Sequence, residues 1–285
     1  MLTLYIGNKN YSSWSMRPWV LMRQAGIAFE EVMLRFDSFE EQSAFKQRAR
    51  ALSPSGRVPV LMDEGMAIWD SLAICEYLAE KFPEKHLWPT LALNRARARS
   101  LCAEMHSGFG ALRSLCPMNI EAQLPEVGAR LWAENTALRD DVQHLSELWQ
   151  PLLSTASGPM LYDQFCIVDA FFAPVCMRLA TYELPVAPAI DAYVRRVRAL
   201  PGVQDWVQGA LAEHDFRPFE EPYRTAAASC VPPVCRLSER LGQQMHQAVH
   251  AVEAVAQAVP LRDERISGVH GGRRGARPPS WAGRA

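Results

Sequence analysis

The segment that decides the fold is "SPSGRVPVLMDEGMAIWDSLAICEYL", residues 53–78. Its two apolar runs, "VPVLM" and "MAIW", flank the turn residues 63–65, a pattern typical of a β-hairpin. From Ser71 to Phe82 the apolar residues recur at helical spacing. The segment therefore predicts two antiparallel strands followed directly by an α-helix.

The chain before this segment predicts two more strands and two more helices. Residues 2–6 alternate between apolar and polar side chains, which indicates a first strand, and residues 27–36 indicate a second. A helical pattern covers residues 15–25, and a short charged helix is expected over residues 38–52. The predicted order is therefore β-α-β-α-β-β-α.

The chain after this segment changes character twice. From about residue 91 to about residue 213, the only periodicity is helical, interrupted by prolines. Residues 226–285 lack lysine and end in a stretch rich in glycine and proline. One helix is possible there, over 237–259, and the last 25 residues are expected to be disordered. The expected domains are residues 1–83, 90–221 and an extension over 222–285.

Composition excludes several classes of protein. The 285 residues carry a formal net charge of −1, which gives no general attraction to nucleic acid or to acidic membranes. The seven cysteines are scattered without a C-x-x-C pair, which favours free thiols in the cytoplasm and no metal site. Neither a secretory signal nor an uninterrupted apolar stretch long enough to span a bilayer is evident. We expect no nucleic-acid or membrane partner.

Four pieces of the chain resemble the soluble glutathione transferase superfamily. They are "YSSWSMR", "SPSGRVPVL", "WDSLAICEYL" and "YDQFCIVDAFFAPV", in this order. The resemblance implies an α+β, thioredoxin-like N-terminal domain, βαβαββα, followed by an all-α domain. It also implies glutathione as the cofactor and a cytoplasmic homodimer. The serine-rich opening is most similar to the zeta class and its bacterial relatives, although Trp14 stands where the zeta pattern has cysteine.

Two pairs of residues are candidates for holding glutathione. Proline lacks an N–H group, so Pro59 fits the start of a strand, where Val58 could pair with an extended peptide. Ser71 is expected to be the N-cap of a helix, and free N–H groups at such an end can hold a carboxylate. An edge-strand proline and simple capping are the alternatives. The resemblance implies a cis peptide bond before Pro59 and pairing of the Val58 main chain with glutathione. It also implies that Asp70 and Ser71 hold the γ-glutamyl end of glutathione. Arg57 is a further candidate for binding glutathione.

The serines at the start of the first predicted helix are candidates for catalysis. The resemblance places Ser12 and Ser13 beside the glutathione sulfur. A hydroxyl donor and a helix N-terminus both favour a thiolate over a thiol. Ser12 is expected to donate to the thiolate with Ser13 as its neighbour, and Ser15 is expected to cap the helix. For Arg17, a surface ion pair and a role in the site both remain open.

A pocket for the second substrate is expected between the two domains. The residues His106, Phe109 and Arg113 share one face by helical spacing, and with Trp14 they are the candidate substrate-binding residues. Arg113 could attract an acidic substrate or bond to the other domain. The substrate is expected to be a small electrophile.

One polar pair in the second domain is assigned to folding. Cys166 occupies the position of the usual Ser or Thr in a capping box, and Asp169 is expected to bond back to the N–H group of Cys166.

Three functions agree with the resemblance. The first is a glutathione transferase that adds the thiolate to an electrophile. The second is a glutathione-dependent cis–trans isomerase of a small diacid. Known zeta isomerases carry an arginine about two turns after the proline that matches Pro174, whereas here Thr181 stands there and Arg178 comes one turn earlier. The third is a non-catalytic binding or interaction protein on the same fold.

Overall fold

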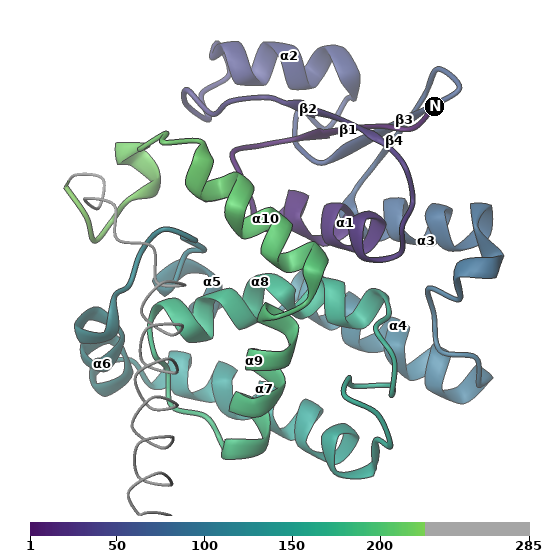
Figure 1. Ribbon diagram of the computed structural model, residues 1–285. Coiled ribbons are helices and arrows are strands. Elements are labelled where there is room, and N and C mark those ends of the chain that lie inside the picture. Colours follow the sequence, from purple (N-terminus) through teal and green to yellow (C-terminus); the bar gives the residue numbers. More distant parts are fainter. Residues whose placement is uncertain (226–285) are drawn as a thin grey trace, which may run out of the picture. The chain divides into compact units, whose positions relative to one another are not determined.

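A mixed sheet of four strands organises the N-terminal part of the computed structural model, which describes residues 1–225 (Figure 1). The strands are β1 (Thr3–Ile6), β2 (Glu30–Met33), β3 (Val60–Asp63) and β4 (Met66–Trp69), in the order β2-β1-β3-β4. β1 runs parallel to β2 and antiparallel to β3, and β3 and β4 form the predicted hairpin.

Helices cover both faces of this sheet. α1 (Ser13–Gln24) and α3 (Ser71–Lys81) lie on one face, and α2 (Ala44–Leu52) lies on the other (Figure 1). The two faces belong to separate apolar clusters, a large one that continues into the helical domain and a small one around Phe36 and Phe45. The predicted order β-α-β-α-β-β-α is confirmed.

The second helix starts later than the sequence predicts. We expected it from residue 38, but α2 begins at Ala44. Ser43 caps it by accepting a hydrogen bond from the N–H group of Lys46, and the Asp37 carboxylate accepts from the N–H groups of Ala44 and Phe45. These bonds fix residues 38–43 in turns, because local side-chain acceptors compete with the helical ladder.

The second part of the described chain is helical, as predicted. Its helices are α4 (Ala92–Ser107), α5 (Gly110–Leu115), α6 (Pro125–Glu134), α7 (Thr136–Thr155), α8 (Ile167–Thr181), α9 (Pro188–Arg198) and α10 (Pro201–Ala212). Three of them start with proline. Proline has no backbone N–H group, and at the first position of a helix that group would have no partner within the helix. Residues 1–225 lie within one compact unit.

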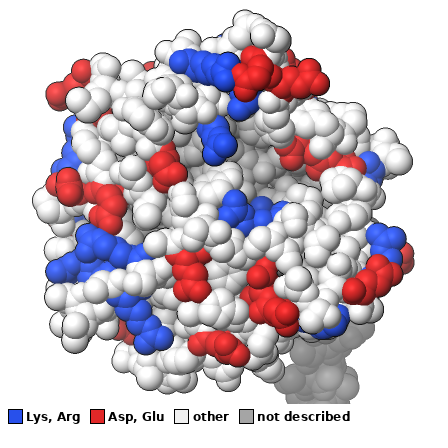
Figure 2. Space-filling view, turned by 180° about the vertical axis from the view of Figure 1, so that it is seen from behind, with Lys and Arg blue, Asp and Glu red and all other residues white. Residues whose placement is uncertain are grey.

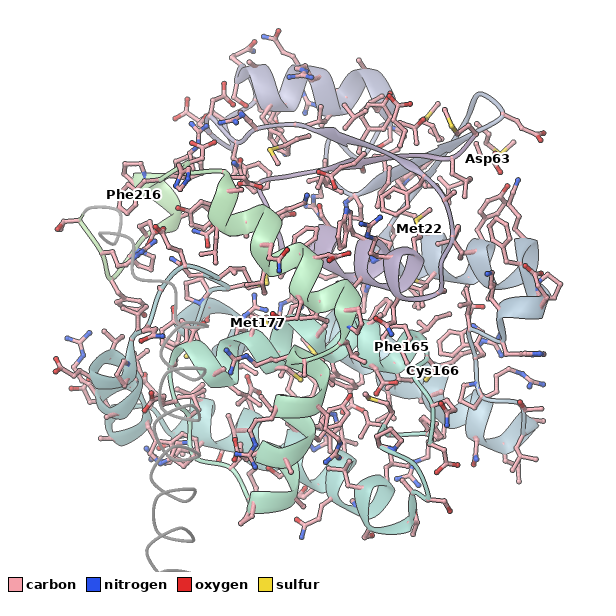
Figure 3. All side chains as sticks on the ribbon, in the orientation of Figure 1. Met22, Asp63, Phe165, Cys166, Met177 and Phe216 are labelled. Atoms are coloured by element: carbon pink, nitrogen blue, oxygen red, sulfur yellow. The ribbon has the colours of Figure 1, made fainter. Side chains whose placement is uncertain are left out.

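α8 is the central helix of this part, and its start confirms the capping role expected for Asp169. Nearly every residue of α8 is buried. The Cys166 N–H group, at the start of α8 (Figure 3), donates to Asp169 Oδ2 at 2.9 Å. The Tyr193 hydroxyl donates to Oδ1 at 2.7 Å. Asp169 therefore links α8 to α9 and supports the fold.

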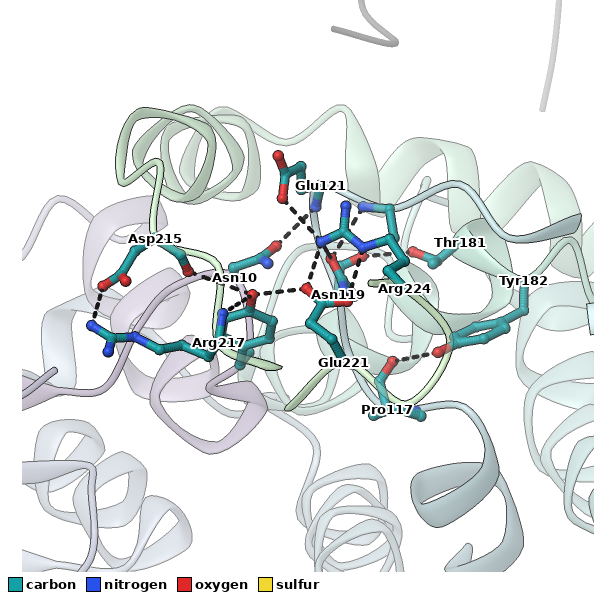
Figure 4. A network of polar contacts seen from close by, with 12 residues as sticks. Asn10, Pro117, Asn119, Glu121, Thr181, Tyr182, Asp215, Arg217, Glu221 and Arg224 are labelled. Carbon is teal, nitrogen blue, oxygen red and sulfur yellow. Dashed lines mark hydrogen bonds and ion pairs between the residues drawn. The ribbon is translucent and has the colours of Figure 1, made fainter. Parts of the chain in front are cut away.

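The packed chain continues past residue 221, where the extension was expected to begin. The Tyr223 hydroxyl donates to the carbonyl oxygen of Leu115 at 2.7 Å. Arg224 pairs with Glu121 at 3.0 Å and also with the buried Glu221 (Figure 4). The segment 213–224, called here the C-terminal strap, thus lies against the helical domain. The predicted helix over 237–259 and the expected disorder of the last residues lie outside the described residues.

We expect a variant that ends at Thr225 to keep the Tm of the full chain, because it retains every contact that the structure describes for the strap. A variant that ends at Asp215 loses the contacts of Glu221 and Arg224, and its Tm should fall by about 5 °C. Calorimetry of both variants tests this. Equal Tm values for the two truncated chains would show that residues 216–224 add nothing to stability.

Candidate active site

The loop between β1 and α1 is held by residues distant in sequence. The Asn8 side-chain amide donates to Glu213 at 3.1 Å and to Asp215 at 2.9 Å, both from the C-terminal strap. The Tyr11 hydroxyl donates to Glu221 Oε1 at 2.8 Å. From the other side, the side-chain oxygen of Asn10 accepts from the N–H group of Glu121 at 2.9 Å (Figure 4). The loop therefore enters α1 from a fixed position.

Ser12 and Ser15 are turned inward at the start of α1. The Ser12 hydroxyl donates to Ser15 Oγ at 2.7 Å, and Ser15 Oγ also accepts from the N–H group of Gly7 at 3.1 Å. Both serines are buried. The expectation that Ser15 caps the helix is wrong, because Ser12 occupies the N-cap position and the Ser15 side chain joins α1 to the end of β1.

Ser13 is the first residue of α1 and is only half-buried. Its Oγ accepts a hydrogen bond from Arg178 Nη2 at 3.3 Å. Because a guanidinium can only donate, this contact leaves the Ser13 hydroxyl proton available to another acceptor. The Ser12 proton, in contrast, is directed to Ser15.

One cavity of about 310 Å³ brings most of the predicted site residues together. The Val58-Pro59 peptide bond is cis, as the resemblance implied, and directly precedes β3. The cavity also contains Ser55 and Trp69, which the sequence analysis did not single out. The predicted residues that line it are Trp14, Arg57, Val58, Pro59, Asp70, Ser71, His106 and Arg113.

Three predicted residues do not line this cavity. Ser12 and Ser13 lie at the start of α1, next to the lining residue Trp14. Phe109 is buried and stacks on His144 at 5.8 Å between ring centroids. Its φ of 56°, at the break between α4 and α5, takes it off the regular helical spacing on which its placement rested. Phe109 therefore does not line the cavity that contains His106 and Arg113.

The N-cap of α3 is Asp70, and not Ser71 as predicted. Asp70 has a φ of 75°, and its Oδ1 accepts from the Leu72 N–H group at 2.8 Å. The other carboxylate oxygen lies 3.1 Å from Nε2 of His106. Ser71 is buried, and within residues 1–225 its hydroxyl has no hydrogen-bond partner. Buried polar groups are normally paired, so this hydroxyl is suited to a ligand in the cavity.

Two guanidinium groups and one imidazole ring lie against the ring of Trp14, another residue of the cavity lining. The guanidinium carbons of Arg17 and Arg113 lie 4.1 and 4.7 Å from the centre of its ring, and the His106 ring meets it edge-on at 4.9 Å. The electrons on the face of an aromatic ring attract a cation, so the indole ring of Trp14 stabilises the two guanidinium groups. Arg17 is only 2% exposed, so the surface ion pair considered for it is excluded.

Arg178 lies beside the candidate catalytic serines, although no role in the site was predicted for it from the sequence. In the sequence it is distinguished only by lying one turn before the position of the arginine in known zeta isomerases. The structure buries it in α8, where Nε donates to the Cys116 carbonyl oxygen at 2.8 Å and Nη2 reaches Ser13. Burial and the nearby Arg113 lower the pKa of Arg178 to about 10.

The described residues contain neither a membrane-spanning helix nor a metal-binding cluster. No helix among residues 1–225 is both long and apolar enough to cross a membrane. The same residues contain no group of three or more His, Cys, Asp or Glu side chains placed to hold a metal ion.

Comparison with known sequences finds a family and several relatives. Residues 11–81 match the family model "Glutathione S-transferase, N-terminal domain". A protein of Caenorhabditis elegans named probable maleylacetoacetate isomerase is 30% identical over 186 residues, which cover 65% of this chain and 82% of that protein. A stringent starvation protein A homolog of Haemophilus ducreyi is 24% identical over 167 residues, 57% of this chain and 73% of the homolog.

Comparison with solved structures points to the same family as the comparison with known sequences. A glutathione transferase homolog from Burkholderia with bound glutathione is 27% identical and superposes with a TM-score of 0.58, over 74% of this chain and 98% of that structure. The chain has the fold of glutathione transferase structures, in which a thioredoxin-like N-terminal domain is followed by a helical domain. The chain therefore belongs to the glutathione S-transferase superfamily.

Proposed function

We propose that the protein is a glutathione transferase that adds the glutathione thiolate to a small electrophile. The observation that carries the proposal is one cavity lined by cis Val58-Pro59, Asp70 and Ser71, whose buried hydroxyl has no hydrogen-bond partner within residues 1–225. These groups offer an extended backbone, a carboxylate and a hydroxyl donor. They match the cysteinyl main chain, the ammonium group and the γ-glutamyl carboxylate of glutathione.

The binding end of the cavity fits this tripeptide. Val58 precedes β3, so its backbone lies beyond the strand pairing and can pair with an extended peptide. Ser71 and the N-terminal N–H groups of α3 can donate to a carboxylate. An unpaired buried hydroxyl costs about 1–3 kcal/mol, and a bound carboxylate would remove this cost. The Asp70 carboxylate would hold the ammonium group.

The start of α1 fits the reactive end. Glutathione would supply the nucleophilic sulfur there. In our proposal Ser13, rather than Ser12, donates the hydrogen bond that stabilises the thiolate, since Arg178 occupies only an acceptor site on Ser13 Oγ. The positive end of α1 and the buried guanidiniums of Arg17 and Arg178 also favour the ionised form.

Replacing Ser71 by alanine tests the binding end. We expect the Kd for glutathione to rise about tenfold, because a hydrogen bond to a charged group is lost, while kcat changes little. Titration calorimetry and steady-state kinetics with an aryl halide give the two values. Ser100→Ala, on an exposed part of α4, is the control and should leave both unchanged. Wild-type protein that neither binds glutathione nor turns over the aryl halide would contradict the proposed function.

The contact between His106 and Asp70 predicts how glutathione binding depends on pH. Burial lowers the pKa of His106 despite the opposing effect of Asp70, with Arg17 and Arg113 acting in the same direction as burial. A lowered pKa means that His106 takes up its proton only at a more acid pH than an ordinary histidine does. The charged imidazolium would then compete with the glutathione ammonium group for Asp70. KM for glutathione should rise at acid pH in the wild type and not in His106→Gln.

A second candidate function follows from the Caenorhabditis elegans relative, whose name describes a maleylacetoacetate isomerase. In such a reaction the thiolate would add to a double bond, allow rotation and leave. Assay with a cis-configured diketo acid and with an aryl halide separates the two functions. Turnover of the diacid alone would favour the isomerase.

A non-catalytic role is the third candidate, and it would gain support if the protein bound no glutathione. The similarity to a stringent starvation protein A homolog motivates it. A homodimer in the cytoplasm stays a prediction.

A further inference from the structure

Three arginines around the proposed reaction centre have no acidic partner among the described residues. Arg17 and Arg178 are 2% and 6% exposed, and Arg113 is half-buried. Arg178 donates to Ser13 Oγ and to the carbonyl oxygens of Cys116 and Pro174, all uncharged acceptors. Within residues 1–225, Nε and Nη1 of Arg17 make no hydrogen bond at all.

The three guanidiniums also act on one another. Burial and the charges of Arg178 and Arg113 lower the pKa of Arg17 to about 9, so it remains charged at neutral pH. A buried charge without a counter-ion is costly, and it is normally paired. Figure 2 shows a hollow near the middle of one face, with Lys or Arg side chains at its edge. The structure thus concentrates uncompensated positive charge beside the cavity.

Glutathione alone would not balance this charge. Its thiolate, placed beside Ser13, would offset one positive charge. Its γ-glutamyl carboxylate would lie at Ser71 and the start of α3, and its ammonium group would pair with Asp70. Its glycine carboxylate, at the opposite end of the extended tripeptide, would continue past Val58 toward Arg57, which also lines the cavity. Positive charge would therefore remain at Arg113, which lines the cavity and lies over the ring of Trp14.

We propose that the electrophile bound in this cavity carries a carboxylate, which contacts Arg113. This inference rests on the proposed function and names its substrate class. Arg113 lines the cavity, and its Nη1 donates to the carbonyl oxygens of His106 and Gly108 at 3.1 and 3.4 Å, which fix the side chain. Its Nε and Nη2 make no hydrogen bond within the described residues and are available to a carboxylate. Arg17 and Arg178 add positive charge from the buried side.

Two matched conjugates test this inference by binding alone. S-(4-carboxybenzyl)glutathione and S-(4-carbamoylbenzyl)glutathione span both halves of the site and differ only in the charge of one group. By titration calorimetry, we expect the carboxylate conjugate to bind wild-type protein about tenfold more tightly. Arg113→Gln should remove this preference while keeping the affinity for the carbamoyl conjugate. Arg195→Gln, an equal change of charge at an exposed ion pair on α9, should keep the preference.

The possible results distinguish a failure of the carboxylate inference from a failure of the proposed transferase function. Equal affinities of the wild type for the two conjugates would overturn the inference and leave the proposed function standing. A preference that persists in Arg113→Gln would also overturn it. Failure of the wild type to bind either conjugate would overturn the proposed function and the inference with it.

Discussion

Replacing Ser13 by alanine is expected to raise the pKa of the bound glutathione thiol and to lower kcat/KM at pH 6.5 about tenfold. The physical reason is the loss of one hydrogen bond to a charged sulfur, a contact worth about 1.5–3 kcal/mol. Glutathione affinity should change little, because the proposed binding groups at Val58 and Ser71 line the cavity and Ser13 does not. The ultraviolet absorbance of the thiolate, followed against pH with saturating glutathione, measures the pKa directly.

Ser12→Ala is the matched control for this experiment. Ser12 is buried and donates to Ser15 at 2.7 Å, so its loss should affect the start of α1 and not the thiol. The pH profile should then follow that of the wild type. If Ser12→Ala shifts the profile and Ser13→Ala leaves it in place, the donor is Ser12.

Replacing Asp169 by alanine is expected to lower the free energy of unfolding by about 4 kcal/mol, because each buried donor left without its acceptor costs about 1–3 kcal/mol. Its carboxylate accepts from the Tyr193 hydroxyl and from the N–H group of Cys166, and every one of these residues is buried. For a chain of this length the fall in Tm should be about 10 °C. Thermal unfolding followed by calorimetry measures it.

Two other variants show whether this loss comes from the buried acceptor. Asp169→Asn keeps oxygen and size at the same place and should lose less stability. Asp191→Ala removes an exposed carboxylate paired with Arg195 on α9, where a loss of under about 1 kcal/mol is expected. A Tm for Asp169→Ala equal to that of Asp191→Ala would contradict the folding role of Asp169.

The order of elements was predictable because it depends on periodicity and on turn residues close together in the chain. The hairpin around residues 63–65 and the proline at residue 59 are local features, and the structure has both a hairpin and a cis bond there. The residues of the cavity could be grouped because the resemblance supplied their relative positions. Eight of the predicted site residues line one cavity.

The sequence did not predict the features that depend on backbone dihedral angles or on how deeply a side chain is buried. Asp70 rather than Ser71 caps α3 because the chain turns there with a φ of 75°, which no spacing rule indicates. Phe109 misses the cavity because α4 stops at Ser107 and helical spacing no longer applies beyond it. Arg17 and Arg178 looked ordinary in sequence, since spacing gives the face of a helix and not how deeply it is buried.

A crystal structure with bound glutathione tests the proposed mechanism most directly. We predict the sulfur within about 3.5 Å of Ser13 Oγ, a hydrogen-bond distance for sulfur, and the γ-glutamyl carboxylate at the Ser71 hydroxyl. A tripeptide whose sulfur points away from the first turn of α1, beyond the reach of Ser12 and Ser13 alike, would contradict the mechanism.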